Sequence, residues 1–291
     1  MNGSTDVALA TGIPLTAGVL IPLWLGWCYL RGLRRLRSHS RGRRAMHGRP
    51  WALAAGVAVT ALATAPPLGE VLEHRLSTHM AQHMTLIVVS GPLLAASGPG
   101  LPLLAGLPAG LRRVLVRALR RVPTLSAVGP HLAWGLQIGA LWLWHLPAAY
   151  DEAVADPVAH LAEHACFLLT GWLFWWYLLA PTRRRLEGPV AVLYLVAAIP
   201  PGAALGAVLT FSSHPLYPLQ ERLANSAGVD PLADQRLAGL VMWVPLDFAY
   251  VALAVLILGK WFAAMGRRWP EPTYLVIDDP VIDEPSPWSI R

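Results

Sequence analysis

The chain has 291 residues, of which 55% are apolar and only 14% are charged, and its mean hydropathy is +0.47. An average soluble domain carries about 25% charged residues, so the composition argues against a soluble enzyme, a disordered protein and a nucleic-acid-binding domain. The net charge of +6 comes from basic residues that fall between apolar stretches, as in membrane proteins. Two cysteines, Cys28 and Cys166, are too few for a disulfide framework. The composition therefore predicts an all-α polytopic membrane protein with the lipid bilayer as its surroundings and no nucleic-acid partner.

Uncharged stretches predict seven transmembrane helices. A helix needs about 20 mostly apolar residues to cross the hydrocarbon layer. One uncharged run, 76–111, is too long for a single span, and we expect its helix to end near Ser97, where a Ser-Gly-Pro-Gly sequence follows. The seven predicted spans lie within 7–30, 51–69, 76–97, 122–150, 164–182, 188–220 and 237–259.

The arginines predict the orientation of these spans. Eight lie between the first and second spans, five between the third and fourth, and three between the fifth and sixth, while Lys260 and three more arginines follow the seventh. The alternate connections hold only Arg75, Arg222 and Arg236. Because basic residues favour the cytoplasmic side, the N-terminus is expected outside and the C-terminus in the cytoplasm.

Two further segments are expected not to span. Residues 111–122 place apolar side chains on one helical stripe and five arginines opposite, which is typical of an interfacial helix on anionic lipid or of a solvated loop that carries topology charge. Residues 269–291 are rich in proline and acidic side chains and are expected to be disordered. The chain is thus divided into a seven-helix transmembrane domain, 1–268, and an acidic proline-rich cytoplasmic tail, 269–291.

Histidines concentrate at the predicted outer ends of the spans. Two segments, His79-Met80-Ala81-Gln82-His83 and His160-Leu161-Ala162-Glu163-His164, share one pattern where the chain enters the membrane from outside. Residues four apart share a helix face, so each pair offers two imidazoles to one ion, and neighbouring third and fifth spans would bring four together. The alternative for each pair is hydrogen bonding between helices.

Imidazole ligands indicate copper, zinc, iron or nickel, and nearby thioethers favour Cu(I). Acids on the same side could orient the ligands. The candidate metal ligands are His79, His83, His160, His164, His145, Met80 and Met84, and the candidate supporting residues are Gln82, Glu163, Asp151, Asp234, Gln235 and Met242.

Three segments resemble the seven-helix CtaG-type cytochrome c oxidase assembly proteins. They are 79–84, the stretch from Trp144-His145-Leu146-Pro147 to His164, and 234–243 with the sequence Asp-Gln-Arg-Leu-Ala-Gly-Leu-Val-Met-Trp. The resemblance implies a multi-pass protein of the bacterial plasma membrane that helps to mature a haem–copper oxidase by handling copper. Its expected partners are oxidase subunits or copper chaperones. Asp247, within the last span, is not part of that pattern.

Other function classes remain open at this stage. A copper transporter of the plasma membrane is the alternative, since an importer also binds metal at its outer mouth. A di-iron membrane enzyme is disfavoured because the chain has no His-His pair. A di-haem protein needs histidines spaced across the membrane. No nucleophile–base pair accompanies the histidines, so no enzyme activity is expected.

Overall fold

The computed structural model describes residue 24 and residues 26–36, 50–65, 75–121, 129–181 and 185–268. These residues form helices and connecting turns, with no strand among them, which confirms the all-α prediction. The tail 269–291 and most of the first predicted span lie outside the described residues. The named helices are α3 Pro50–Ala63, α5 Leu76–Met84, the π-helix η1 Thr85–Ser90, α6 Gly91–Ser97, α7 Gly100–Gly106, α8 Ala109–Arg121, α10 Pro130–Trp144, α11 Pro147–Ala155, α12 Pro157–Leu179, α13 Gly188–Val196, α14 Ile199–Phe211, α15 Pro218–Ser226 and α16 Pro231–Arg268.

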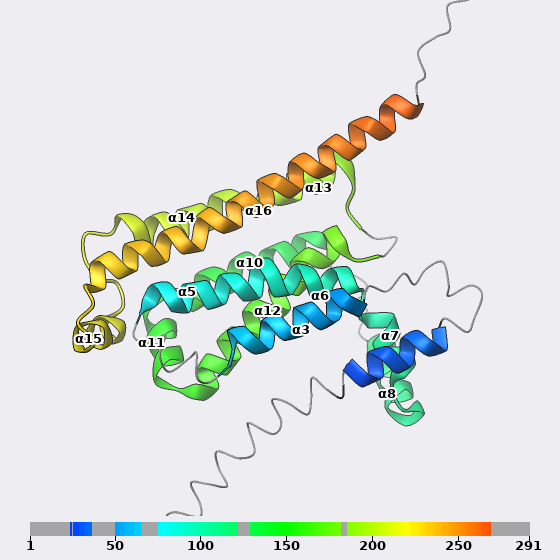
Figure 1. Ribbon diagram of the computed structural model, residues 1–291, viewed down its shortest axis with the longest axis horizontal. Helices are drawn as coiled ribbons and strands as arrows, with labels where there is room; N and C mark the ends of the chain where they lie inside the picture. Colours follow the sequence, from blue (N-terminus) through cyan, green and yellow to red (C-terminus); the bar gives the residue numbers. More distant parts are fainter. Residues whose placement is uncertain are drawn as a thin grey trace, which may run out of the picture.

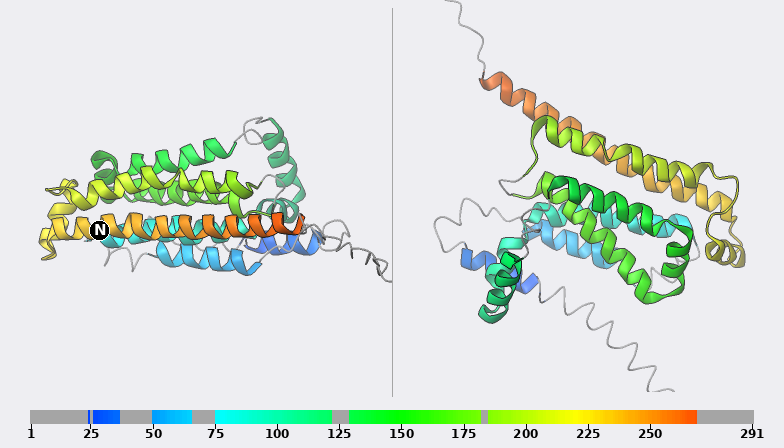
Figure 2. Two further views of the ribbon diagram at one scale, coloured as in Figure 1. Left: turned by 90° about the horizontal axis from the view of Figure 1, so that it is seen from above. Right: turned by 180° about the vertical axis from the view of Figure 1, so that it is seen from behind.

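The long helices lie roughly side by side (Figure 1). Helices α13 and α14 follow one another along α16, while α3, α10, α12 and the continuous stretch α5–η1–α6 form the rest of the bundle. The short helices α11 and α15 lie at one end, whereas α7, α8 and the helix at 26–36 lie at the other, and Figure 2 shows the same segregation from two further directions. Helices α7 and α8, which belong to the arginine-rich connection between the third and fourth predicted spans, thus lie at the end opposite to α11 and α15.

Three described stretches are long and apolar enough to cross a membrane, namely Leu76–Ser97, Gly188–Phe211 and Pro231–Arg267. This is fewer than the seven spans expected from the sequence. Helix α3 is apolar but has only 14 residues, and α10 has 15. Helix α12 has 23 residues, but its first turns contain two histidines and a glutamate, which lower its mean hydropathy.

Several helix ends differ from those expected, because the absence of charge does not by itself define a helix. The predicted span 188–220 ends as a helix at Phe211, before a segment that contains Pro215. The run 122–150 divides into α10 and α11 at Pro147. Helix α12 begins at Pro157, earlier than the predicted 164, because the Asp156 carboxylate accepts hydrogen bonds from the first free backbone N–H groups.

Specific contacts fix α5 and η1 within the bundle. The Asp234 carboxylate of α16 accepts hydrogen bonds from the backbone N–H of Leu76, at 2.6 Å, and from the Ser77 hydroxyl, so α16 caps the start of α5. The Trp175 indole of α12 donates a hydrogen bond to Ile87 O in the π-helical turn η1, at 2.8 Å. These contacts join α5 to α16 and η1 to α12.

A close approach also joins α14 to α16. A Cβ built on Gly239 would lie 2.8 Å from the carbonyl oxygen of Gly206, so only glycine fits here.

At the other end of the molecule, the predicted amphipathic segment 111–122 forms α8, and its apolar residues Leu111 and Val114 are exposed.

Candidate metal site

The two histidine pairs meet at one point of the bundle, as the sequence predicts for neighbouring helices. The rings of His79 on α5 and His160 on α12 stack with centroids 5.2 Å apart. The His83 and His164 ring centroids, one turn deeper, are 5.3 Å apart. His79, His83 and His164 are buried, whereas His160 is partly exposed and lies nearest the solvent.

Glu163 lies at the centre of this cluster. Its side chain is fully buried, and Oε2 lies 3.3 Å from His79 Nε2 and 3.5 Å from His83 Nε2. Neither carboxylate oxygen has a hydrogen-bond partner among the described residues, and the same is true of both ring nitrogens of His83. A buried carboxylate without such partners is costly unless a positive charge compensates it.

A second pair of donor atoms lies at the edge of the cluster. His145 Nδ1 is 2.6 Å from the carbonyl oxygen of Leu141, so we assign the ring hydrogen to Nδ1, which donates to that oxygen. His145 Nε2 then carries a lone pair, and it faces the Met80 sulfur at 3.1 Å. Neither atom has a hydrogen to share, so this contact is suited to a soft cation that both can bind.

Tyrosines and a glutamine from the connecting segments cover the cluster. The Tyr150 ring packs against His79, with centroids 5.3 Å apart, and its hydroxyl donates to Gln220 Oε1. Tyr217 donates to the carbonyl oxygen of His145. Burial, assisted by the negative charge of Glu163, raises the pKa of both phenols, so they remain protonated donors.

The remaining predicted residues lie around this centre. The Gln82 amide donates to Ala63 O and so connects α5 to α3, and Gln235 accepts from Leu216 N and donates to Leu209 O. Asp151 has one buried oxygen with no hydrogen-bond partner within the described ranges. Of the other residues predicted from the sequence, Asp234 caps α5, and Met84 and Met242 lie in the apolar core.

Three residues that contact the site were not predicted from the sequence, namely Tyr150, Tyr217 and Gln220. Tyr150 belongs to one of the motifs, next to Asp151, but its ring contact with His79 depends on the turn at Pro147. Tyr217 and Gln220 follow a connection of irregular structure and carry no signal that points to the histidines. Glu163 was expected only to support the ligands, whereas it lies among them.

The donor set fits a metal ion. One ligand atom from each of His79, His160, Glu163 and His164 lies within 4.8 Å of the others. Imidazole and carboxylate ligands bind zinc, copper and iron ions at about 2.0–2.2 Å, which modest side-chain rotation could reach from these positions. In this group, His79 Nε2 and both Glu163 oxygens lack hydrogen bonds within the described residues. The Nε2 atoms of His160 and His164 lie 3.2 Å apart and contact each other, so an ion would replace that contact.

The apolar, membrane-length helices of the bundle and its buried histidine–glutamate cluster are features of a helical membrane protein with a candidate metal site. Residues 27–264 match the family described as cytochrome c oxidase caa3 assembly factor (Caa3_CtaG), and the chain belongs to this family. It is also similar to uncharacterized proteins of Mycobacterium bovis and Mycobacterium tuberculosis, each 29% identical over 202 residues, and of Mycobacterium leprae, 26% identical over 197 residues. These alignments cover 66%, 66% and 64% of the chain but only 30% of each relative, so the chain spans about a third of their length. No solved structure matches the chain significantly.

Proposed function

We propose that the protein binds copper at the histidine–glutamate cluster and delivers it to a subunit of a haem–copper cytochrome c oxidase. The observation that carries this proposal is the buried Glu163 carboxylate, which lies between His79 and His83 without a hydrogen bond in the described structure. Such an arrangement requires a compensating positive charge, which a protonated imidazole or a bound cation can supply. The membership in an oxidase assembly family supports a bound cation and suggests copper.

The ligand types support copper over zinc. A carboxylate with three imidazoles accepts several divalent ions, but the His145–Met80 contact adds a thioether, which is characteristic of Cu(I) sites. The two groups of donors are close, since the His83 and His145 ring centroids are 6.1 Å apart. A cluster with both kinds of donor could hold copper during transfer without a fixed, saturated coordination shell.

The proposed topology has seven spans with the cluster on the outer side. The arginine distribution and the gathering of α11 and α15 at one end support this arrangement. Helix α12 lies alongside η1 and α6, which belong to a stretch of membrane length, so its polar first turns can be shielded by protein rather than by lipid. The partly exposed His160 then gives the cluster access from the outer surface, where an oxidase subunit or a copper chaperone of the bacterial plasma membrane could dock.

Deletion of the gene tests this function in the cell. Haem–copper oxidase activity is expected to fall, and added copper should partly restore it, because delivery is the missing step. A gene with both His79→Ala and His83→Ala should fail to complement, whereas His214→Ala should succeed, since His214 is exposed outside the cluster. Normal oxidase activity together with altered copper uptake would contradict the assembly function and favour a copper transporter.

A further inference from the structure

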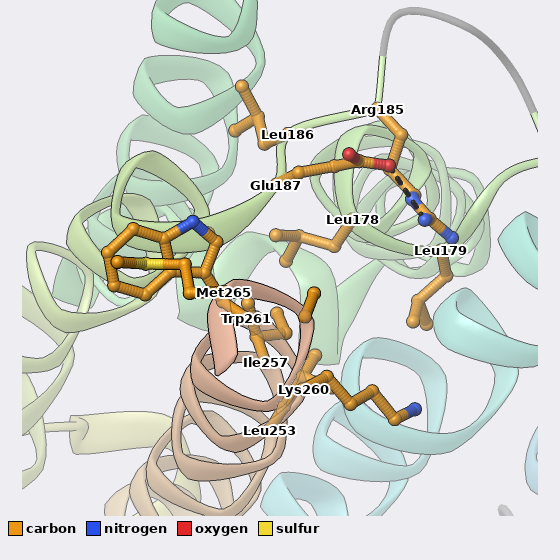
Figure 3. A pocket seen from close by; sticks show the side chains of 12 residues that line it. Leu178, Leu179, Arg185, Leu186, Glu187, Leu253, Ile257, Lys260, Trp261 and Met265 are labelled. Atoms are coloured by element: carbon orange, nitrogen blue, oxygen red, sulfur yellow. Dashed lines mark hydrogen bonds and ion pairs between the residues drawn. The ribbon is translucent and has the colours of Figure 1, made fainter. Parts of the chain in front are cut away.

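A cavity of about 480 Å³ lies at the end of the molecule opposite to the histidine cluster (Figure 3). It lies between the end of α12, the segment that leads into α13, and the last turns of α16. In the proposed topology, this is the cytoplasmic end. None of the residues proposed to bind copper lines it.

The local backbone explains why the cavity exists. After α12 ends, the N–H of Leu186 donates to the carbonyl oxygen of Tyr177 at 2.7 Å, so the chain turns back along the helix it has just left. Helix α13 then starts at Gly188, whose φ of +56° is in the left-handed region. A Cβ at this position would lie 2.7 Å from Cδ1 of Trp261, so glycine lets α13 begin directly against the indole.

The long side of the cavity is apolar. Leu253, Ile257, Trp261 and Met265 line it at intervals of four residues, which places them on one stripe of α16. At about 1.5 Å per residue, this stripe is about 18 Å long. The leucines at the end of α12 form the facing wall. An elongated apolar surface of this length matches a hydrocarbon chain better than it matches a small polar metabolite.

Two cationic side chains lie at the same cavity. Lys260, the one lysine of the sequence, is exposed and makes no ion pair among the described residues. Arg185 pairs with Glu187 at 2.9 Å, but its side chain is 45% exposed and retains donors for a further anion. Figure 3 shows Lys260 extending toward the side of the cavity on which Arg185 lies.

We propose that this cavity binds one anionic phospholipid of the cytoplasmic leaflet, with its phosphate between Lys260 and Arg185 and an acyl chain along the α16 stripe. Anionic headgroups are enriched in that leaflet, and basic pockets between membrane helices are suited to them. Bound lipid would fill the space between α12 and α16 and fix the end of the bundle from which the tail leaves. The inference rests on the proposed topology for the identity of the leaflet, but it is independent of copper binding.

Native mass spectrometry of the purified full-length protein tests the proposal. The protein in detergent is titrated with phosphatidylglycerol and, separately, with phosphatidylcholine of the same acyl chains. At equal lipid concentration, we expect at least threefold more bound phosphatidylglycerol. Lys260→Gln should remove most of this preference. Arg267→Gln should leave it unchanged, because Arg267 is an exposed cation of the same helix that does not line the cavity.

A second variant tests the apolar part of the site. Ala264 lines the cavity, and Ala264→Phe should reduce the binding of both lipids without changing any charge. Helix content, measured by circular dichroism, shows that each variant remains folded. Equal retention of the two lipids by the wild type would overturn the proposal, as would identical behaviour of Lys260→Gln and Arg267→Gln.

Two competing occupants give different results. Complete displacement of the lipid by glycerol 3-phosphate at the same concentration would show a simple anion site and overturn the lipid proposal. A chain that ends at residue 268 and binds far more phosphatidylglycerol than the full chain would show that the acidic tail is the normal occupant. Copper binding should be the same in all of these samples, so the test fails or succeeds separately from the proposed function.

Discussion

Removal of the Asp234 carboxylate should weaken the contact between α16 and α5 and thereby disturb the histidine pair. Asp234→Ala leaves three donors unpaired, namely the backbone N–H groups of Leu76 and Ser77 and the Ser77 hydroxyl. Loss of a helix cap costs about 0.5–2 kcal/mol, and a hydrogen bond to a charged group contributes about 1.5–3 kcal/mol. Because Asp234 is buried and its N–H contact with Leu76 is short, we expect a loss of about 3 kcal/mol in the free energy of unfolding.

Asp230 provides a matched control on the same helix. Its carboxylate accepts from Leu232 N and Ala233 N, so it caps the start of α16 locally, and its side chain is exposed. Asp230→Ala should therefore cost about 1 kcal/mol. Denaturant titration of the purified protein, followed by circular dichroism, compares the two variants.

Copper binding further distinguishes the role of Asp234, which caps α5, from that of Asp230, which caps α16. His79 lies less than one turn after Ser77, so Asp234→Ala should weaken copper binding, whereas Asp230→Ala should not. Equal stability losses in the two variants, or unchanged copper affinity in Asp234→Ala, would refute the idea that α16 positions the histidine pair through this cap.

Two further predictions concern packing and topology. Gly239→Ala should force α14 away from α16 and reduce the free energy of unfolding by about 2 kcal/mol. Gly259→Ala should be neutral or slightly stabilising, because a Cβ at Gly259 meets no atom within 4 Å. Equal effects of the two variants in the same denaturant titration would contradict the close approach. A reporter fused after Arg291 should be active in the cytoplasm, and one inserted near Asp156 should be active outside, with opposite signals contradicting the proposed orientation.

The convergence of the histidines could be predicted because it depends on local periodicity. Residues four apart on a helix share a face in any context, so each pair was expected to act as a unit. Their meeting needed only the additional condition that α5 and α12 be neighbours, which the stacked rings of His79 and His160 confirm.

The central place of Glu163 could not be predicted in the same way. It is three residues after His160 and so lies near the histidine face, but its direction depends on how α12 is rotated against α5. The contact of Tyr150 depends on the turn between α10 and α11, and that of Tyr217 on the connection after α14. Such segments have no repeating pattern from which a contact could be read.

Helix ends were misplaced for a related reason. Uncharged stretches marked the apolar regions of the chain, but prolines and hydrogen bonds to the backbone decide where helices begin and end. The π-helical turn at Thr85–Ser90 is the clearest case, since its mainly apolar sequence lies within one uncharged run and carries no local signal for a π-helical turn. The bond from Trp175 to Ile87 O is a tertiary contact that stabilises it, and a local pattern does not reveal such contacts.

The most direct test of the central claim is the Cu(I) affinity of the purified protein, measured at neutral pH by competition with a chromogenic chelator. The wild type is compared with the His79→Ala/His83→Ala and His160→Ala/His164→Ala double variants, the quadruple variant, and His214→Ala as a control. If all four histidines bind one ion, either double variant should lose most of the affinity and the quadruple variant should lose little more, because ligands of one ion do not act additively. His214→Ala should match the wild type. Additive losses would contradict a shared site, and unchanged affinity in every variant would contradict metal binding by these histidines.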